Sequence, residues 1–361
     1  MQTDKYQKLI TFHFAKEIAK RHTRKQLRCV IFGNFGANNL GDEALLAGEI
    51  QELQTLNNIK ITVAARNPAE IKRLHNVQAI KLTDFNAIRK ELKRSDFAIV
   101  GGGGLINKVQ RGVIGFVYQL MMLAFFFYLP LLLKKKLYVL GVGVYNNANP
   151  LIVSLVVPAL RAAEIVTVRD FTSQAFLKEK DVLSSLYKDN SYLMPTLTKQ
   201  QVLKEAFFAE KYNPDKINIG ISLVKPVNKK DEKRLITAME HFVSLYQGKA
   251  DFWFFPADFH PGYDHDAKFA EAIKGLQPGQ SDSNVYFVPT TYSPELFFSS
   301  FRLMDKMVAM RFHAMLFAYR LKVPFVGIPY ETKCTSLIES IGRKPLSLKT
   351  LKNDAVDKNV L

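Results

Sequence analysis

The chain has 361 residues, enough for two domains of ordinary size, and 48% of them are hydrophobic, which is ample for buried cores. Its two cysteines, Cys29 and Cys334, exclude a disulfide-based scaffold and a cysteine-rich metal site, and no His, Cys or Asp spacing resembles a zinc or iron site. The net charge of +17 implies an anionic partner. Scattered Lys and Arg without a nucleic-acid-binding motif argue against nucleic acid and favour an anionic membrane surface.

A basic amphipathic helix is predicted within residues 1–26. Its apolar residues share one helical face, while lysines and arginines fill much of the remainder. This face consists of Tyr6, Leu9, Ile10, His13, Phe14 and Ile18. Such a helix either lies among lipid headgroups or packs on its own domain, and we favour the packed helix. The segment lacks the continuous apolar core of a signal peptide.

A first array of alternating strands and helices is predicted for residues 27–195. Short apolar runs mark its strands at 29–32, 59–64, 77–82, 97–100, 137–142 and 165–168. The first strand runs into a Gly/Asn loop at 33–44, where glycines permit close backbone approach to a ligand. This loop is neither a P-loop nor a dinucleotide fingerprint, because the spacing of its glycines and the residues that follow fit neither motif.

Two further strand ends of this array carry candidate binding groups. Four glycines at 101–104 follow the strand 97–100, and we expect their backbone N–H groups to be free to face a ligand or a second chain segment. Arg169 and Asp170 follow the strand 165–168. Both positions lie at the carboxyl ends of predicted parallel strands, where open α/β sheets bind ligands.

Residues 112–133 form an uncharged apolar run of roughly 22 residues, long enough to cross a bilayer. The run lies between the strands 97–100 and 137–142, which are expected to be neighbours in one sheet. Spanning would place those neighbours on opposite sides of a membrane, so the sequence predicts a buried crossover helix. A helix that dips into a membrane is the alternative.

A second array is predicted for residues 215–345, with strands at 217–223, 252–255, 285–288, 306–310 and 325–328. Arg311 and His313 stand where the strand 306–310 ends and a helix begins, and Lys333 follows the next strand. We expect the three to converge on a small, strongly anionic ligand. Alternatively, Arg311 and Lys333 are solvated surface charges and His313 is a hydrogen-bonded core residue.

The segment 255–266 is dense in Asp and His and follows the strand 252–255. Its candidates for an acid, a base or a contact to acceptor hydroxyls are Asp258, His260, Asp264, His265 and Asp266. A solvated loop with an Asp helix cap explains any single one of them equally well.

Two such arrays predict an α/β protein with two doubly wound, Rossmann-like domains and an active site in the cleft between them. The expected divisions are a basic N-terminal segment at 1–26, domains at 27–195 and 215–345, and a polar tail at 346–361. The first domain is expected on the acceptor side and the second on the donor side.

Four motifs, taken in order, resemble the polysaccharide pyruvyl transferase family. They are the segment 36–44 (GANNLGDEA), the glycines with Leu105 at 101–105, the segment 167–170 (TVRD), and Arg311-Phe312-His313-Ala314 with residues 324–333. The resemblance spans roughly residues 28–341. One departure is visible at Met194-Pro195-Thr196, where a Pro-Asp pair is expected, so no carboxylate role is assigned there.

The resemblance implies a GT-B-like fold and the transfer of an enolpyruvyl-derived group from phosphoenolpyruvate to two hydroxyls of a sugar, forming a ketal on a cell-envelope polysaccharide or exopolysaccharide precursor. It assigns Arg169, Arg311, His313 and Lys333 to phosphoenolpyruvate. For catalysis we select His313 and Asp266, and for the acceptor Asn38, Asn39, Asp42, Gly103 and Gly104. His313 either holds the phosphate or shuttles a proton, and the residues leave both roles open. No metal or cofactor is expected, because cations already offset the charge of the donor.

Two rival functions remain: a GT-B-type glycosyltransferase that uses a sugar nucleotide, and a non-catalytic basic protein that binds membrane or nucleic acid. The expected partners are phosphoenolpyruvate and a glycan or lipid-linked sugar, with peripheral contact to an anionic membrane and no nucleic acid. The expected location is the cytoplasm, with peripheral association at the inner face of the cytoplasmic membrane.

Overall fold

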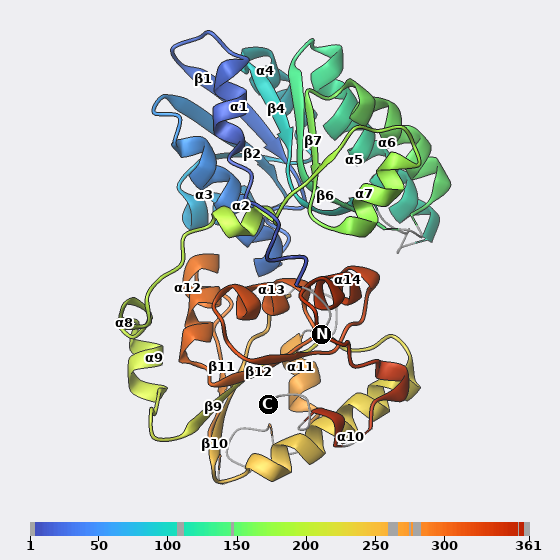
Figure 1. Cartoon of the computed structure of the whole chain (residues 1–361). Helices are drawn as coiled ribbons and strands as arrows, with labels where there is room; N and C mark the ends of the chain where they lie inside the picture. Colours follow the sequence, from blue (N-terminus) through green and yellow to red (C-terminus); the bar gives the residue numbers. More distant parts are fainter. Residues whose placement is uncertain are drawn as a thin grey trace. The chain divides into compact units, whose positions relative to one another are not determined.

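The computed structural model describes residues 4–106, 112–145, 148–258, 266–273, 276, 283–352 and 354–356 (Figure 1). The chain divides into two compact units. The N-terminal unit comprises Tyr6–Ala37 and Asp42–Pro195, and the C-terminal unit comprises Met1–Lys5, Asn38–Gly41 and Thr196–Leu361. The short segment Asn38–Gly41 therefore belongs with the C-terminal unit, although its neighbours in sequence on both sides belong to the other.

The N-terminal unit is built on an eight-stranded sheet in which every pairing is parallel. The strand order is β3-β2-β1-β4-β6-β7-β8, with β5 paired to β6. The strands are β1 (Leu27–Phe32), β2 (Ile59–Ala65), β3 (Gln78–Lys81), β4 (Phe97–Val100), β5 (Gly103–Ile106), β6 (Lys136–Val144), β7 (Ile165–Val168) and β8 (Ser185–Leu186). The chain order reverses between β1 and β4, so this pair is the topological switch point of the sheet.

Helices cover both faces of this sheet and bury separate apolar clusters against it (Figure 1). On one face lie α1 (Phe14–Lys20), α2 (Leu40–Gln54) and α3 (Pro68–His75). The other face carries α4 (Phe85–Arg94), α5 (Gly112–Leu132), α6 (Pro150–Ala162) and α7 (Phe171–Lys178). Burial on both faces explains why the central strands read as continuous apolar runs.

The C-terminal unit repeats the plan with a five-stranded parallel sheet in the order β11-β10-β9-β12-β13. Its strands are β9 (Ile217–Ser222), β10 (Ala250–Phe254), β11 (Val285–Phe287), β12 (Lys306–Ala309) and β13 (Phe325–Gly327). Its helices are α8 (Lys199–Val202), α9 (Ala206–Lys211), α10 (Lys229–Tyr246), α11 (Asp266–Glu271), α12 (Pro294–Ser299), α13 (Phe312–Arg320) and α14 (Thr332–Ser340). Here the switch point lies between β9 and β12.

The glycine run at 101–104 differs from its prediction. Gly103 and Gly104 begin strand β5 rather than a turn. The N–H of Gly101 donates to the carbonyl of Phe32 (2.7 Å), and that of Gly102 donates to the Glu49 carboxylate (2.9 Å). These two N–H groups are therefore not free for a ligand, because a strand carbonyl and a buried carboxylate already accept from them.

Helix α5 is a crossover helix, as predicted, because β4 and β6 are parallel neighbours. The prediction that it is buried is only half right. Met122, Leu123, Phe126, Phe127 and Pro130 are buried, but several apolar residues of the same helix are exposed. Within the described residues, α5 is the one helix long and apolar enough to cross a membrane by length and composition.

The described residues near both ends of the chain contribute side chains to the cores of the two units. Of the apolar face predicted for the N-terminal segment, Tyr6, Phe14 and Ile18 are fully or almost fully buried in the N-terminal unit, but Ile10 is 66% exposed. The predicted helix is also shorter than expected: in the described part of residues 4–26 it covers Phe14–Lys20, and residues 6–13 are not helical. The polar tail expected from residue 346 is likewise not separate over its described residues. Leu348, Leu351 and Val356 are buried in the C-terminal core, because these scattered apolar side chains find a place against α10 and the sheet.

Candidate functional site

The switch point of the C-terminal sheet places Arg311 two residues after the end of β12. Met310 N–H donates to Ser222 O at the end of β9 (2.8 Å), so the ends of the two strands lie together. Arg311 is extended, with φ −65° and ψ 136°, and it is the residue that precedes helix α13. The guanidinium therefore stands at a strand end beside a helix N-terminus, where free N–H groups and the helix dipole favour anions.

Two carboxylates hold this guanidinium. Asp266, at the start of α11, accepts from Arg311 Nη2 (2.6 Å) and Nε (3.0 Å), and its side chain is 2% exposed. Asp258 lies 3.3 Å from Nη1 and is 34% exposed. The Arg311 side chain itself is 17% exposed. Of the five N–H groups of a guanidinium, the two that face Asp266 are occupied, so Arg311 has a fixed orientation and keeps donors for a ligand.

The pKa values of the pair follow from burial and charge. Burial raises the pKa of the Asp266 carboxyl above its ordinary value, against the opposing charge of Arg311. Burial disfavours the charged form of Arg311, but the acidic groups around it, Asp266 first among them, together outweigh burial and raise the pKa of the guanidinium. Arg311 is thus a permanent cation. Asp266, which holds it, is an orienting group in the structure, and the catalytic role predicted for it stays a prediction.

Lys333 belongs to the same neighbourhood. It lies in the first turn of α14, and its Nζ is 2.9 Å from Glu331 Oε2. Burial raises the pKa of Tyr330, and the charges of both Lys333 and Arg311 oppose that rise, so Tyr330 lies within electrostatic reach of both cations. Tyr330 is a group that sequence reasoning did not select. The signal for it in the sequence is its position two residues after the predicted strand 325–328, between Arg311 and Lys333.

His313 lies in the first turn of α13 and packs against the segment Asn38–Gly41. A Cβ atom at Gly41 would overlap His313 Nδ1, so only glycine fits there. Leu40 N–H donates to Ala257 O (2.9 Å), Asn39 pairs with Asp258 in an antiparallel bridge, and Asn39 Oδ1 accepts from Gly41 N–H (2.9 Å). Asn38 adopts a left-handed conformation with φ 57°, which Asn tolerates well. Two predicted acceptor residues thus adjoin predicted donor residues within one unit.

The remaining predicted residues lie in the N-terminal unit. Arg169 follows β7 and forms a buried ion pair with Asp189 (Nη1 to Oδ2, 2.8 Å). Asp42 accepts from Asn34 Nδ2 (2.9 Å), and a Cβ at Gly103 would be in van der Waals contact with its Oδ1. A Cβ at Gly104 would meet the ring of Tyr145. The structure therefore gathers Arg311, His313 and Lys333 in one unit, and Arg169, Asp42 and the two glycines in the other.

Sequence reasoning missed Glu49 of α2, a fully buried carboxylate at the switch point of the N-terminal sheet. Its Oε1 accepts from Gly102 N–H and from Asn190 Nδ2, each at 2.9 Å. Burial raises the pKa of Glu49 to about 7. Asp189, the residue before Asn190 in the sequence, pairs with Arg169. A chain of buried polar contacts therefore leads from the glycine run through Glu49 and Asn190 to Arg169. A Glu on the apolar side of a helix is the signal in the sequence that marks it.

Part of the Asp/His segment lies outside the described residues, including His260, Asp264 and His265. Of its candidates, Asp258 and Asp266 are described, and both face Arg311. Within the described part of the chain, no cluster of three or more His, Cys, Asp or Glu has the arrangement of a metal site.

These features define a two-domain α/β protein with basic side chains at strand ends, and comparison with known proteins identifies its family. The family model for polysaccharide pyruvyl transferase matches residues 39–332, most of the chain. The chain belongs to the polysaccharide pyruvyl transferase family. No curated protein sequence matches it.

Similar solved structures support the fold. A structure of MnaA with UDP from S. aureus has a TM-score of 0.62 at 12% identity, covering 92% of this chain and 86% of that chain. The UDP-GlcNAc 2-epimerase from Methanocaldococcus jannaschii has a TM-score of 0.60 at 11% identity, covering 92% and 91%. The UDP-GlcNAc 2-epimerase from Neisseria meningitidis has a TM-score of 0.57 at 12% identity, covering 92% and 90%. At this identity the likeness concerns the fold, a GT-B-like pair of Rossmann-like domains, as predicted.

Proposed function

We propose that this protein is a pyruvyl transferase that uses phosphoenolpyruvate to form a pyruvate ketal on a sugar of a cell-surface polysaccharide precursor in the cytoplasm. Family membership supports a transferase of this class. The observation that carries the donor assignment is Arg311, held in a fixed orientation by Asp266 at a strand end. A preorganised guanidinium suits the carboxylate or phosphate of phosphoenolpyruvate through paired N–H···O bonds.

Other cationic and dipolar groups of the C-terminal unit complete the donor proposal. His313 and Lys333 lie in the first turns of α13 and α14, whose N-termini favour negative charge. Asp258 partly offsets the charge of Arg311, and Glu331 partly offsets that of Lys333. A bound phosphoenolpyruvate would take over from the more exposed of these carboxylates, and it would keep Asp266 as the support of Arg311.

The reaction we propose adds one sugar hydroxyl to C2 of phosphoenolpyruvate while a proton is delivered to the methylene carbon. The C2–phosphate bond then breaks, inorganic phosphate leaves, and the second hydroxyl adds to C2 and loses its proton. The products are the ketal and phosphate. His313 is our candidate for holding the phosphate or moving one of these protons, since an imidazole can donate a hydrogen bond to phosphate and can accept or release a proton.

For the acceptor we propose Asn38 and Asn39, whose segment packs on His313, together with Asp42, Gly103 and Gly104. Amide and carboxylate groups suit the hydroxyls of a sugar, and the absence of a side chain at glycine permits close approach. Arg169 is proposed as a further phosphoenolpyruvate contact. Its side chain is 3% exposed, against 17% for Arg311, so it is the less accessible of the two arginines for an anion.

The donor site is tested by calorimetric titration of phosphoenolpyruvate into Arg311→Ala, Lys333→Ala and the control Lys230→Ala, which removes an exposed charge of the same unit. Loss of a charge-assisted hydrogen bond costs roughly 1.5–3 kcal/mol, so each site variant should bind about ten- to a hundredfold more weakly, with no change in the control. Unchanged affinity in both site variants would overturn the assignment.

A thermal-shift comparison separates the rival functions. Phosphoenolpyruvate should raise the melting temperature and a sugar nucleotide should not, because only a ligand that binds the native state stabilises it. The opposite result would favour a glycosyltransferase. A response to neither, with binding that collapses in salt, would favour a non-catalytic basic protein. Mass spectrometry of the acceptor glycan, with a gain of the pyruvate ketal, identifies the product.

A further inference from the structure

The outer face of helix α5 is apolar where a surface helix is ordinarily polar. Val113, Ile114, Val117, Met121 and Leu132 are exposed, at 79%, 87%, 57%, 46% and 77%. At 100° per residue these five positions fall within an arc of about 100° on one side of the helix. The buried residues of α5 occupy the opposite side and belong to the core of the N-terminal unit. The helix thus has two apolar faces, and only one of them packs on the sheet.

The helix that neighbours α5 carries exposed basic side chains. Helix α4 is the neighbour of α5, since Phe85 and Phe125 pack edge to face with ring centroids 4.7 Å apart. The exposed charged side chains of α4 are all basic: Arg89, Lys90, Lys93 and Arg94. At the other end of the contact, Lys135 Nζ donates to the carbonyls of Lys93 (3.0 Å) and Ser95 (2.7 Å), which brings exposed Lys134 beside the end of α4.

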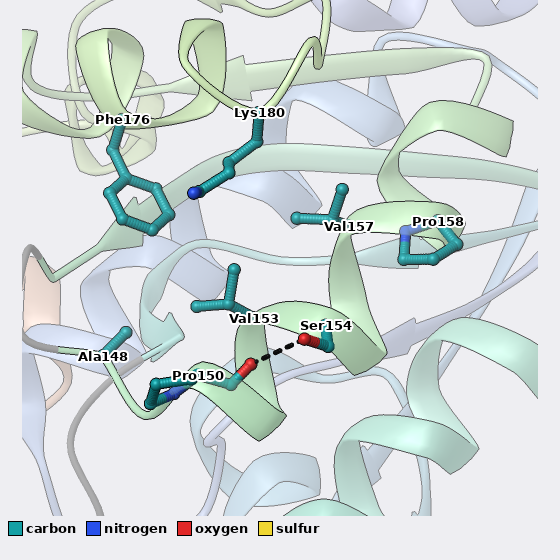
Figure 2. Close-up of a pocket in the computed structure, with 8 residues that line it drawn as sticks. All are labelled: Ala148, Pro150, Val153, Ser154, Val157, Pro158, Phe176 and Lys180. Carbon is teal, nitrogen blue, oxygen red and sulfur yellow. Dashed lines mark hydrogen bonds between the residues drawn. The ribbon is translucent and has the colours of Figure 1, made fainter.

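The apolar surface continues on the other side of α5. Helix α6 adjoins it, with Tyr128 Oη donating to Leu155 O (2.7 Å), and Leu151 of α6 is 61% exposed. Between α6 and the α7 side lies a pocket lined mainly by Pro150, Val153, Val157 and Phe176, with the Lys180 side chain extended toward the Phe176 ring (Figure 2). An apolar surface beside a helix of basic side chains is the pattern of a surface that meets anionic lipid.

We propose that the face formed by α4, α5 and α6 docks on an anionic lipid bilayer, with the outer residues of α5 entering the headgroup layer. The net charge of +17 and the basic side chains of α4 complement an anionic leaflet. A second copy of the chain complements this face poorly. The exposed charges of α4 are all basic, so two copies would bring like charges together, and α5 has no acidic residue to offset them. The proposal does not depend on the pyruvyl transfer reaction, and its tests contain no substrate.

The first test is co-sedimentation of the full chain with vesicles of phosphatidylcholine alone or mixed with phosphatidylglycerol. The wild type should bind the mixed vesicles. Ile114→Glu and Val117→Glu should each weaken binding at least roughly tenfold, since an inserted aliphatic side chain is replaced by a charge. The control is Val227→Glu, which makes the same change at a fully exposed residue of the other unit. Equal binding by all four proteins would overturn the proposal.

The second test removes charge. Lys90→Gln with Lys93→Gln should weaken binding by roughly fivefold per charge at low salt, and less at high salt. Lys229→Gln with Lys230→Gln, two exposed lysines of α10, is the matched control. Equal loss in both pairs would show attraction by total charge alone and would overturn the assignment of this face.

A third test reports the position of α5 directly. Both native cysteines are buried, so Ile114→Cys supplies the single accessible thiol for an environment-sensitive fluorophore. Emission should shift to the blue on phosphatidylglycerol vesicles for this label and not for Val227→Cys. If vesicles leave the emission unchanged while light scattering shows a dimer that Ile114→Glu dissociates, the face is an interface between copies and the lipid proposal is wrong.

Discussion

At the scale of single residues, Arg311 meets two carboxylates of different exposure, and we expect them to affect an anionic ligand in opposite ways. Asp258→Asn removes a partly exposed negative charge beside the guanidinium. Phosphoenolpyruvate should then bind about two- to fivefold more tightly, a modest gain because the charge is screened by solvent. Asp266→Asn removes the buried partner, so binding should weaken and the protein should lose about 3–5 kcal/mol of stability. Calorimetric titration and thermal melting measure both effects.

The two Asp variants are each other's control, because each replaces one carboxylate by an amide of the same shape. A change in affinity of the same sign in both would mean that Arg311 does not contact the ligand.

Glu49 should make stability depend on pH. Its folded pKa of about 7 lies above the reference value, so the folded state holds this proton more tightly than the unfolded state. Its ionisation therefore costs stability as pH rises from about 4.5 to 7, and the full cost, on the order of 3 kcal/mol, is present above that range. Glu49→Gln keeps the acceptor oxygen and cannot ionise. The variant should gain stability relative to the wild type as pH rises through this window.

Denaturant unfolding of both proteins at pH 5 and pH 8 measures this difference. Glu49→Ala serves as the comparison, because it loses the acceptor for Gly102 and Asn190 and should be destabilised at both pH values. A stability difference between Glu49→Gln and wild type that stays constant with pH would mean that Glu49 is ionised throughout.

At the scale of elements, the contact of Gly41 with His313 fixes the segment Asn38–Gly41 against α13. Gly41→Ala should cost roughly 1–3 kcal/mol, because its Cβ would overlap the imidazole. His313→Ala removes the obstacle, so the double variant should recover most of that cost in a double-mutant cycle. Gly143→Ala is the control, since a Cβ there meets only ordinary contacts. Additive effects of the two substitutions would contradict the contact. Thermal melting supplies all four values.

The elements also show where sequence patterns suffice. The strands at 97–100 and 165–168 have the predicted bounds, because buried parallel strands are continuous apolar runs ended by Gly or charge. Strand β5 was not predicted, since Gly103 and Gly104 have low strand propensity and only pairing with β6 makes them a strand. Strand β8 has only two residues, too few to show a pattern in the sequence, and its pairing with β7 defines it.

At the scale of the whole molecule, the two units have separate cores, so damage should stay local. Phe126→Ala in the N-terminal core and Phe254→Ala in the C-terminal core should each cost about 3–5 kcal/mol. Hydrogen exchange should show loss of protection in β4 and β6 for the first variant and in β9 and β10 for the second. Equal loss across both sheets in either variant would mean that the units unfold as one.

The sequence by itself determined the β/α arrays, the family and the strand ends at which Arg311, His313, Lys333 and Arg169 stand. Local patterns carry this information, because period, turn residues and motif order are properties of short segments. Only the tertiary structure decided which groups meet. It paired Arg311 with Asp266, 45 residues away in the sequence, and packed Asn38–Gly41 on His313. It also buried Glu49 where its carboxylate accepts from the N–H of Gly102. The fold turned one apolar face of α5 outward and buried Tyr6, Phe14 and Ile18 of the N-terminal segment. Burial depends on what packs against a face, and that partner is distant in sequence.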